Sequence, residues 1–374
     1  MRILHITYWY PHEESPQNGI FIKNHIDGLQ GHCENEVIHI QVKRANSIWK
    51  KSISKSSVIY KTRFAKYYKI QEKLSLKALK EVFEQRDMST YDAVNIHIAS
   101  PLGNQIDYFR NKYKIPFIVT EHWTAYHRFF GLDPKAPGLQ RMKDIFKQKF
   151  KLITVSKALA EDIKRFSDVE RLNFEVVPNI IDTEIFQYKS DDNKDLTFFM
   201  LTNWSPEKNP IALLKALSKL DTDFHLRIGG EGVLLKDMKT FVKKKELNSK
   251  VTFLGRITPQ EAAQEFQKAS FFLHSAHYET FSVVCAEALC CGCPVIASNI
   301  PAITEYLDSD SGKLVDDFRK SEQQLIENTW LNTLNELNTK EFDRSKIAQK
   351  FQDKFGVERV SQQYFDVIKK YINE

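Results

Sequence analysis

Residues 271–297 read FFLHSAHYETFSVVCAEALCCGCPVIA, and they predict a strand, a helix and a second strand in succession. The runs 271–274 and 295–297 are short and almost wholly apolar, which is typical of strands buried on both faces of a parallel sheet. The helix is expected between them, at 282–291. Two parallel strands joined by a helix form the repeating unit of α/β proteins, so this stretch predicts a parallel sheet covered by helices.

The same alternation continues along most of the chain. Further strands are expected at 2–8, 37–42, 93–98, 117–120, 152–155, 175–177, 197–201, 225–228 and 251–254. Helices are expected at 71–86, 102–111, 157–165, 210–220, 234–245 and 259–268. Two successive sets of such units predict an α/β protein with two doubly wound, Rossmann-like domains. Because ligands of such sheets bind at the carboxyl ends of the strands, we expect the active site in a central cleft that the two domains face.

The length of 374 residues agrees with two domains, because a single core rarely grows beyond about 250–300 residues. The polar run 189–195 interrupts the alternation and marks the join. We expect a first domain at 1–187, a second domain at 195–355 and a closing helix at 356–374. The closing helix has an apolar stripe that includes Val360, Tyr364 and Ile368.

The net charge of +6 is unevenly distributed along the chain. Residues 1–185 hold 29 Lys and Arg against 21 Asp and Glu, whereas the remainder holds 25 against 27. The segment 43–80 carries twelve basic side chains and one acid, Glu72. Its aromatic residues at 60, 64, 67 and 68 follow a spacing that predicts an amphipathic helix for part of the segment, and Trp49 adds to them. Such a segment suits an anionic membrane surface or nucleic acid, and a solvated surface loop is the commonest alternative.

Several classes of protein are disfavoured. No stretch approaches the ~18 consecutive apolar residues of a membrane-spanning helix. Residues 1–10 read as a strand rather than a signal peptide, so we expect a cytoplasmic protein. The five cysteines are odd in number, and four of them cluster at 285–293 without partners at zinc-ligand spacing. This pattern favours buried, reduced thiols over disulfides or a metal site.

Two carboxylates stand eight residues apart in the stretch quoted first. Glu287 lies in the middle of an otherwise apolar helix, where a carboxylate needs hydrogen-bond partners. Glu279 precedes that helix by a few residues, and eight helical residues advance about 12 Å. The backbone amides of Phe281 and Ser282 would open the helix and form an anion site. A structural alternative explains the same spacing equally well: one acid would stabilise the start of the helix, and the other would form a salt bridge at the rim of the domain.

The stretch around Glu279 and Glu287 resembles the Glu-x7-Glu motif of the retaining glycosyltransferases of family 4, which have the GT-B fold. Further sequence motifs of that family have similar counterparts here in the same order, at residues 153–156, 177–182, 251–255 and 291–297. Together these matches cover nearly the whole chain. The resemblance implies the GT-B fold, with the closing helix packing back on the first, acceptor-side domain and the second domain binding the donor.

The resemblance also implies roles for particular residues of the second domain. Glu279 would lie beside the donor sugar, with Thr280, Phe281 and Ser282 next to it, and Glu287 would bind the nucleotide ribose. Ser282 stands where the family usually has Gly.

The run 202–209 is similar to the family's Gly-Arg-Leu-x-x-x-Lys-Gly/Asn, so Lys208 would hold the diphosphate. Without the neighbouring motifs, the preferred interpretation of Lys208 would be a solvated lysine at the start of a helix. Asn203 stands where an arginine is usual, and its amide can bind a phosphate oxygen but supplies no charge.

Three further positions are candidates for the site. Gly19, in the loop 11–21, could let the backbone approach a phosphate or an acceptor. Gly230 and Glu231 lie in a Gly-rich turn that a plain strand-to-helix connection explains, and the resemblance implies contact with the nucleotide. His122 resembles the family's histidine that faces the donor sugar, and a structural histidine bonded to a carbonyl is the alternative.

The function that the resemblance implies is transfer of a hexosyl group from a nucleotide-sugar to a glycan or lipid-linked acceptor, with retention, in the synthesis of a bacterial surface polysaccharide. The resemblance implies that the charge is stabilised without a metal, and we expect neither a metal nor a cofactor. The segment 43–80 would then contact an anionic membrane near a lipid-linked acceptor, at the inner face of the cell membrane, and nucleic acid becomes the least expected partner. The alternatives are a non-catalytic nucleotide-sugar or polyanion-binding protein, and an epimerase or phosphorylase of the same fold.

Overall fold

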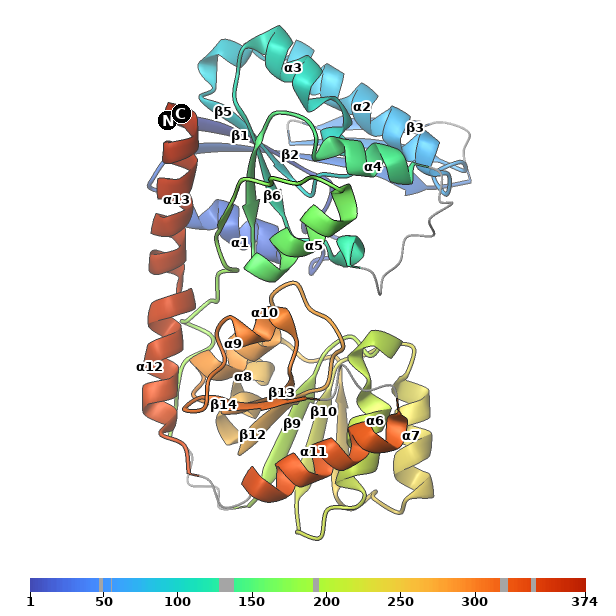
Figure 1. Ribbon diagram of the computed structural model, residues 1–374. Coiled ribbons are helices and arrows are strands. Elements are labelled where there is room, and N and C mark those ends of the chain that lie inside the picture. Colours follow the sequence, from blue (N-terminus) through green and yellow to red (C-terminus); the bar gives the residue numbers. More distant parts are fainter. Residues whose placement is uncertain (47–49, 55, 128–137, 191–194, 317–321, 338–340) are drawn as a thin grey trace. The chain divides into compact units, whose positions relative to one another are not determined.

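The computed structural model describes residues 1–46, 50–54, 56–127, 138–190, 195–316, 322–337 and 341–374. The chain divides into two compact units (Figure 1). Unit 1 comprises Met1–Ile180 and Glu358–Glu374, and unit 2 comprises Ile181–Val357. The boundary therefore lies before residue 187, where the first domain was expected to end. The polar run 189–195 belongs to unit 2, and residues 191–194 of it lie outside the described residues.

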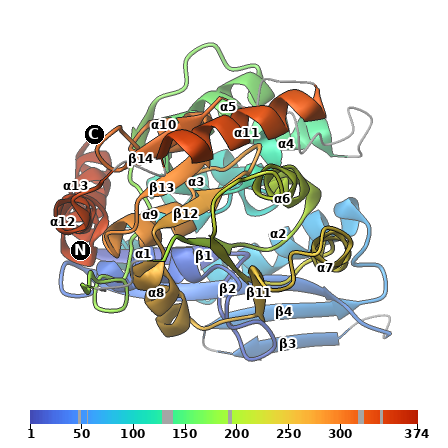
Figure 2. The ribbon, with the colours of Figure 1, turned by 90° about the horizontal axis from the view of Figure 1, so that it is seen from below.

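Unit 1 is built on an eight-stranded sheet with the order β3-β4-β2-β1-β5-β6-β7-β8, part of which can be followed in Figure 2. In the described ranges every strand pair of this sheet is parallel except β3 and β4. The strands are β1 (Arg2–Thr7), β2 (Glu34–Arg44), β3 (Lys50–Ser54), β4 (Ser57–Thr62), β5 (Ala93–His97), β6 (Phe117–Glu121), β7 (Lys151–Thr154) and β8 (Phe174–Val176).

The helices of unit 1 connect these strands and cover the sheet (Figure 1). They are α1 (Ile20–Gly28), α2 (Tyr68–Glu84), α3 (Ile106–Tyr113), α4 (Leu139–Ile145), α5 (Lys157–Ser167) and α13 (Val357–Asn373). Short 3-10 turns lie at η1 (Met88–Thr90), η2 (Leu102–Gln105) and η3 (Thr124–Tyr126).

The basic segment 43–80 is partly a hairpin. Residues 50–54 and 57–62 form the antiparallel pair β3 and β4 at one edge of the sheet, so Tyr60 lies on a strand and the prediction of a helix there was wrong. Pairing with β2 explains the difference, because it buries the side chains of Val58, Tyr60 and Thr62 on one face of β4. Helix α2 begins only at Tyr68, and Trp49 lies outside the described residues.

The closing helix α13 packs on the sheet of unit 1. Val360, Tyr364 and Ile368 are fully buried in a cluster that includes Ile3 and Ile118 of the central strands. The hydroxyl of Tyr364 accepts a hydrogen bond of 2.6 Å from the Asn95 amide and lies 3.0 Å from Thr120 Oγ1. This helix therefore supplies both apolar and polar contacts to the core of unit 1.

Unit 2 is built on a six-stranded parallel sheet with the order β11-β10-β9-β12-β13-β14. Its strands are β9 (Thr197–Leu201), β10 (His225–Gly229), β11 (Val251–Gly255), β12 (Phe271–His274), β13 (Val295–Ser298) and β14 (Gly312–Val315). Its helices are η5 (Pro206–Lys208), α6 (Pro210–Leu217), α7 (Leu235–Lys244), α8 (Pro259–Lys268), α9 (Val283–Cys290), α10 (Pro301–Thr304), α11 (Gln323–Leu337) and α12 (Arg344–Phe355). The predicted architecture of two doubly wound parallel sheets is thus confirmed.

Each sheet contains a point where the strand order reverses. In unit 1 the chain moves outward from β1 to β2, and β5 then pairs with the other side of β1. In unit 2 the reversal lies between β9 and β12. In open α/β sheets ligands bind outside the carboxyl ends of the strands at such a point. The loops that follow β1, β5, β9 and β12 are therefore the expected positions of a ligand site.

Within the part of the chain that the structure describes, no helix combines the length and the apolar character that crossing a bilayer requires.

We predict that Tyr364→Phe lowers the free energy of unfolding by about 1–3 kcal/mol, because the buried Asn95 amide loses its acceptor. Urea unfolding measures this difference. The matched control is Tyr108→Phe on the half-exposed surface of α3, which should change stability by less than about 0.5 kcal/mol. Equal losses in the two variants would contradict the role assigned to the Tyr364 hydroxyl.

Candidate active site

The strand reversal in unit 2 brings two loops together. The loop after β9 carries Lys208, and the loop after β12 carries Glu279. Two contacts join these loops near Lys208: Ser275 Oγ donates to the Lys208 carbonyl (2.9 Å), and the His277 amide donates to the Glu207 carbonyl (2.8 Å). The backbone therefore holds the two side chains at one edge of the sheet.

Trp204 anchors the first of these loops. Its side chain is buried, and its indole N–H donates to the Gly229 carbonyl at 3.0 Å. Its backbone amide donates to the Glu231 carbonyl at 2.6 Å. A Cβ on Gly230, which has a φ of 100°, would lie 1.9 Å from the Thr202 carbonyl oxygen, so only glycine fits there. The turn after β10 is thus shaped by its packing on the loop after β9.

Lys208 and Glu279 form an ion pair. The distance from Lys208 Nζ to Glu279 Oε1 is 2.6 Å, and the two side chains are only 17% and 14% exposed. His274, the last residue of β12, places its Nε2 3.1 Å from the same oxygen. Burial by itself raises the pKa of Glu279, but the nearby Lys208 and His274 outweigh this effect and lower the pKa to about 2. The carboxylate is therefore ionised throughout the neutral range.

The turn before α9 is held in an unusual conformation. Ser282 has a φ of 70°, which L side chains rarely adopt, and its hydroxyl lies 3.3 Å from His274 Nε2. The Tyr306 hydroxyl donates to the carbonyls of Phe281 (3.0 Å) and Ser282 (3.3 Å). The Ser282 hydroxyl is thus bonded inside the protein, and the Phe281 side chain is buried, so these two residues present backbone to a ligand. Thr280 is half-buried beside them.

Helix α9 begins at Val283 and has no side-chain cap. The amides of its first turn have no helical carbonyl to bind, so they are available to water or to an anion. The helix start at which an anion site was expected is therefore uncapped, and it begins one residue later than the sequence pattern indicated.

Glu287 lies about one turn into α9, on a face that is partly exposed. Among the described residues, none forms a hydrogen bond or an ion pair with its carboxyl group. Burial raises the pKa of Glu287 to about 8. A half-buried carboxyl group without a protein partner is costly, and a hydrogen-bonding ligand would satisfy it.

The remaining predicted residues of unit 2 lie along the same edge. Asn203 and Glu231 are exposed, in the loops after β9 and β10 that Trp204 joins. Lys208 is the basic residue that reaches the Glu279 carboxylate, whereas Asn203 supplies an uncharged amide. The structure thus places the candidate residues of unit 2 other than Glu287, which lies within α9, in the loops that follow β9, β10 and β12.

In unit 1, Gly19 shapes the loop after β1. It has a φ of 66°, and a Cβ there would lie 2.5 Å from the Trp9 carbonyl oxygen. Helix α1 starts directly after it and brings Phe21 and His25 against His122. The visible role of Gly19 is therefore close packing of the loop, which aims α1 at His122.

His122 follows β6 and is almost fully buried. Its ring is stacked on His97 at 6.2 Å between centroids, and the Phe21 and His25 rings lie at 4.8 and 5.3 Å. Both of its ring nitrogens are buried, and neither forms a well-aligned hydrogen bond among the described residues, although the Asn179 side chain lies beside the ring. Burial, together with the neighbouring His25, lowers the pKa of His122 well below its usual value, so the ring is neutral at pH 7.

Glu121 positions the loop that carries His122, a role that the sequence did not suggest. One of its carboxylate oxygens accepts hydrogen bonds from the amides of His122 (2.8 Å) and Trp123 (2.9 Å). The other accepts from the Ala99 amide (2.8 Å) and the Tyr126 hydroxyl (2.7 Å). Four donors on one fully buried carboxyl group fix the loops after β5 and β6 to each other.

His274 is the second functional side chain that the sequence analysis missed. The available signal was its position, since it is a polar residue at the end of the apolar run 271–274 and thus points to the carboxyl edge of the sheet.

Both units match known protein families in sequence. Residues 55–185 match the sequence model of a family described as Glycosyltransferase Family 4, and residues 181–334 match that of Glycosyl transferases group 1. The two matches meet at the boundary between the units.

Two similar proteins illustrate the relationship. An uncharacterised glycosyltransferase of Methanocaldococcus jannaschii is 29% identical over 282 residues, which is 74% of this chain and 76% of that protein. A second relative, from Campylobacter jejuni, is N-acetylgalactosamine-N,N'-diacetylbacillosaminyl-diphospho-undecaprenol 4-alpha-N-acetylgalactosaminyltransferase. It is 30% identical over 166 residues, which is 43% of this chain and 45% of that protein.

Solved structures share the fold over almost the full length. Sucrose-phosphate synthase from Thermosynechococcus elongatus superposes with a TM-score of 0.75 at 16% identity, covering 99% of this chain and 98% of that one. HepE of Anabaena, in complex with UDP and glucose, superposes with a TM-score of 0.71 at 14% identity, covering 99% and 100%. At these identities the likeness concerns the fold alone.

We predict that Glu287 makes folding less favourable as the pH rises. Between about pH 4.5 and 8 the unfolded chain ionises this carboxyl group while the folded protein keeps it protonated, so the folded state loses stability across that range. Glu287→Gln should flatten this dependence and be the more stable protein at about pH 8. Urea midpoints at about pH 5.5 and 8 measure it, with the exposed Glu322→Gln as control. Parallel pH profiles for the wild type and Glu287→Gln would refute the prediction.

Proposed function

The chain belongs to the family 4 glycosyltransferases of the GT-B fold, and from this premise we propose that it moves a hexosyl group from a nucleotide-sugar to a glycan or lipid-linked acceptor. The proposal includes retention of anomeric configuration and independence from metal ions. The observation that carries it is the Lys208–Glu279 ion pair at the strand reversal of unit 2, next to the uncapped start of α9.

The donor would occupy the carboxyl edge of unit 2. A nucleoside diphosphate leaves with developing negative charge, which the Lys208 ammonium and the first amides of α9 are suited to stabilise. Glu279, ionised and held by His274, would accept hydrogen bonds from sugar hydroxyls. Glu287, which lacks a protein partner among the described residues, would accept hydrogen bonds from the ribose.

His122 is the side chain of unit 1 that we assign to the substrate. A buried imidazole whose nitrogens have only Asn179 beside them, without a well-aligned hydrogen bond among the described residues, is costly unless a ligand or water binds it. Being neutral, the ring can donate from one nitrogen and accept at the other. Glu121 acts on it indirectly, by fixing the backbone of its loop.

The substrate classes are supported by the similar proteins. The Campylobacter relative is named for a diphospho-undecaprenol-linked acceptor, and HepE was crystallised with UDP and glucose. We therefore propose a nucleotide-sugar donor and a lipid-linked acceptor in the synthesis of a surface polysaccharide, with no cofactor.

Helix α2 provides the surface that we propose to contact the membrane. Lys69, Lys73, Lys77 and Lys80 are exposed at spacings of four, four and three residues, so they form one basic stripe. The opposite face of the helix, including Ala78 and Val82, is buried in unit 1. Lys80 lies over the Tyr108 ring, and all four lysine side chains remain exposed. A stripe of exposed lysines suits an anionic lipid surface, and we propose peripheral attachment there.

We predict that Lys208→Ala and Glu279→Gln each lower turnover about 100-fold, because each removes a group that contacts the leaving diphosphate or the sugar. Nucleoside diphosphate released from a panel of nucleotide-sugars, with and without candidate acceptors, measures turnover. Proton NMR of the product determines its anomeric configuration. A parallel assay that contains a chelator of divalent metal ions tests whether turnover needs a metal.

The controls for this assay are Lys236→Ala and Glu322→Gln, both exposed in unit 2 and outside the proposed site. Binding of donors without release would refute the transferase proposal. Full activity of Glu279→Gln would refute the assignment of the site. If the chelator abolished turnover and added divalent ions restored it, metal independence would be refuted.

We predict that replacing Lys69, Lys73, Lys77 and Lys80 by Gln weakens binding to anionic vesicles at least tenfold, since each lysine near such a surface contributes about 1 kcal/mol. Vesicle sedimentation measures this, with zwitterionic vesicles as the reference. The control replaces the four exposed lysines of α7, at 236, 239, 243 and 244, which changes the net charge equally. Equal weakening in both variants would show a general charge effect and contradict the α2 surface.

A further inference from the structure

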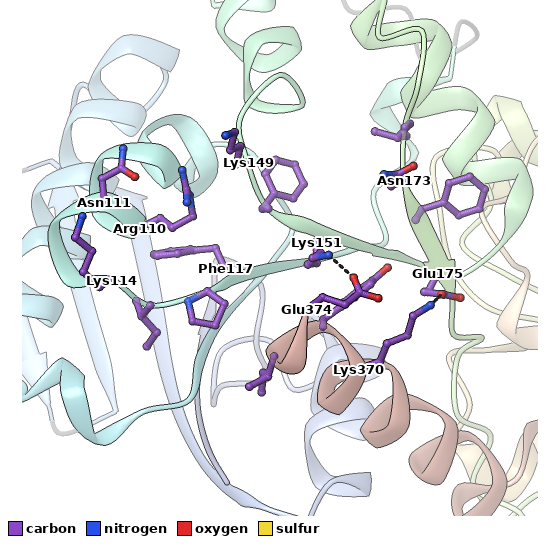
Figure 3. A pocket seen from close by; sticks show the side chains of 17 residues that line it. Arg110, Asn111, Lys114, Phe117, Lys149, Lys151, Asn173, Glu175, Lys370 and Glu374 are labelled. Atoms are coloured by element: carbon purple, nitrogen blue, oxygen red, sulfur yellow. Dashed lines mark hydrogen bonds and ion pairs between the residues drawn. The ribbon is translucent and has the colours of Figure 1, made fainter.

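A large pocket lies in unit 1, away from the residues discussed so far (Figure 3). Its volume is about 950 Å³, and it is formed at the amino ends of β6, β7 and β8, whose first residues Phe117, Lys151 and Phe174 line it. His122 follows the carboxyl end of β6, and a strand of five residues spans about 16 Å. The pocket is therefore at the opposite edge of the sheet from His122.

Five basic side chains line this pocket, and two of them are neutralised. Lys370 pairs with Glu175 at 2.6 Å, and Lys151 pairs with Glu374 (Figure 3). The other three are Arg110, Lys114 and Lys149.

The positive charges of these three residues are balanced weakly or not at all by acidic side chains. Among the described residues, none forms an ion pair with Lys114 or Lys149. Arg110 reaches Asp107 only at 3.5 Å, and its Nε is buried without a hydrogen-bond partner in the part of the chain that the structure describes. The pocket therefore presents a buried donor and two unpaired cations to whatever enters it.

The rest of the lining is apolar and aromatic, with a few amides. Phe117 and Tyr371 are almost fully buried and line the pocket together with Phe174. The side-chain amides of Asn111 and Asn173 are exposed in it. An apolar lining with a few convergent polar groups is typical of sites for small molecules, and Arg and Lys together favour phosphate.

Helix stabilisation accounts for two of the three basic residues but not for the third. Arg110 in the last turn of α3 and Lys114 at its C-cap lie where a cation is favourable for the helix dipole. Lys149 lies in the connection just before β7, outside any helix, and the Arg110 Nε still lacks a hydrogen-bond acceptor among the described residues.

We propose that this pocket binds a phosphorylated small molecule that carries a ring, either a nucleotide or a sugar phosphate. The phosphate interacts with Arg110, Lys114 and Lys149, and the ring packs on Phe174, which is a partly exposed aromatic residue of the lining. The site is separate from the donor site of unit 2, so one molecule of the protein binds ligands at both. The proposal does not depend on the transferase reaction.

The test uses the full chain and hydrogen–deuterium exchange, which tells the two sites apart by the peptides protected. The probes are UDP, ADP, glucose 1-phosphate and pyrophosphate, with uridine and glucose as unphosphorylated counterparts. We expect a nucleotide or the sugar phosphate to protect 110–117 and 149–151, whereas uridine and glucose do not. Protection by UDP and ADP identifies a nucleotide site, and protection by glucose 1-phosphate identifies a sugar-phosphate site.

The variant Lys114→Ala/Lys149→Ala should weaken this binding about 100-fold in equilibrium dialysis, because each lost contact to a phosphate is worth about tenfold. The control is Lys112→Ala/Lys147→Ala, which removes two neighbouring lysines that do not line the pocket. A thermal melt checks that both variants fold.

Three results would overturn the proposal: no probe protects these peptides, both double variants bind equally well, or pyrophosphate alone binds, which would remove the role of the ring. Each of these readouts is independent of sugar transfer, so failure of the proposed function leaves the test of the pocket intact.

Discussion

Parallel strands must end at a common edge, and in unit 2 the order of those strands reverses between β9 and β12. The loops that leave these two strands therefore separate and leave room for a ligand, while their first residues stay close. Lys208 and Glu279 owe their 2.6 Å contact to this arrangement, although 71 residues separate them in sequence. Trp204 and the glycine turn after β10 support the same edge by packing on it, and the start of α9 opens beside it.

Each unit keeps a polar group that its fold alone does not need. In unit 2, Glu279 is satisfied by Lys208 and His274, whereas Glu287 carries a raised pKa. In unit 1, the buried nitrogens of His122 form no well-aligned hydrogen bond among the described residues. Buried polar groups without partners reduce stability, and they persist where a ligand satisfies them. Glu121 shows the opposite case, because four donors satisfy its carboxylate and make it a rigid support for the loop of His122.

Much of the fold could be predicted from the sequence, because strands buried on both faces are short apolar runs that differ clearly from the amphipathic helices between them. Strands β9 and β12 and helix α8 have the bounds that the sequence indicated. The hairpin of β3 and β4 was not predicted, since its alternating residues at 57–62 also fit a helical spacing and only pairing with β2 decides between the two. Strand β14 was missed for a similar reason: four residues beginning with Gly carry too weak a pattern.

The sequence by itself determined the α/β class, the two domains and the identity of most candidate side chains, because hydrophobic period and motif order are local properties of the chain. It did not determine which of those side chains touch. That Lys208 neutralises Glu279, that His274 joins them, and that the Ser282 hydroxyl is turned toward His274 were decided by the tertiary structure. The physical reason is that Lys208 follows β9, whereas His274, Glu279 and Ser282 belong to β12 and the loop after it, so these contacts depend on strand order and on how that loop folds.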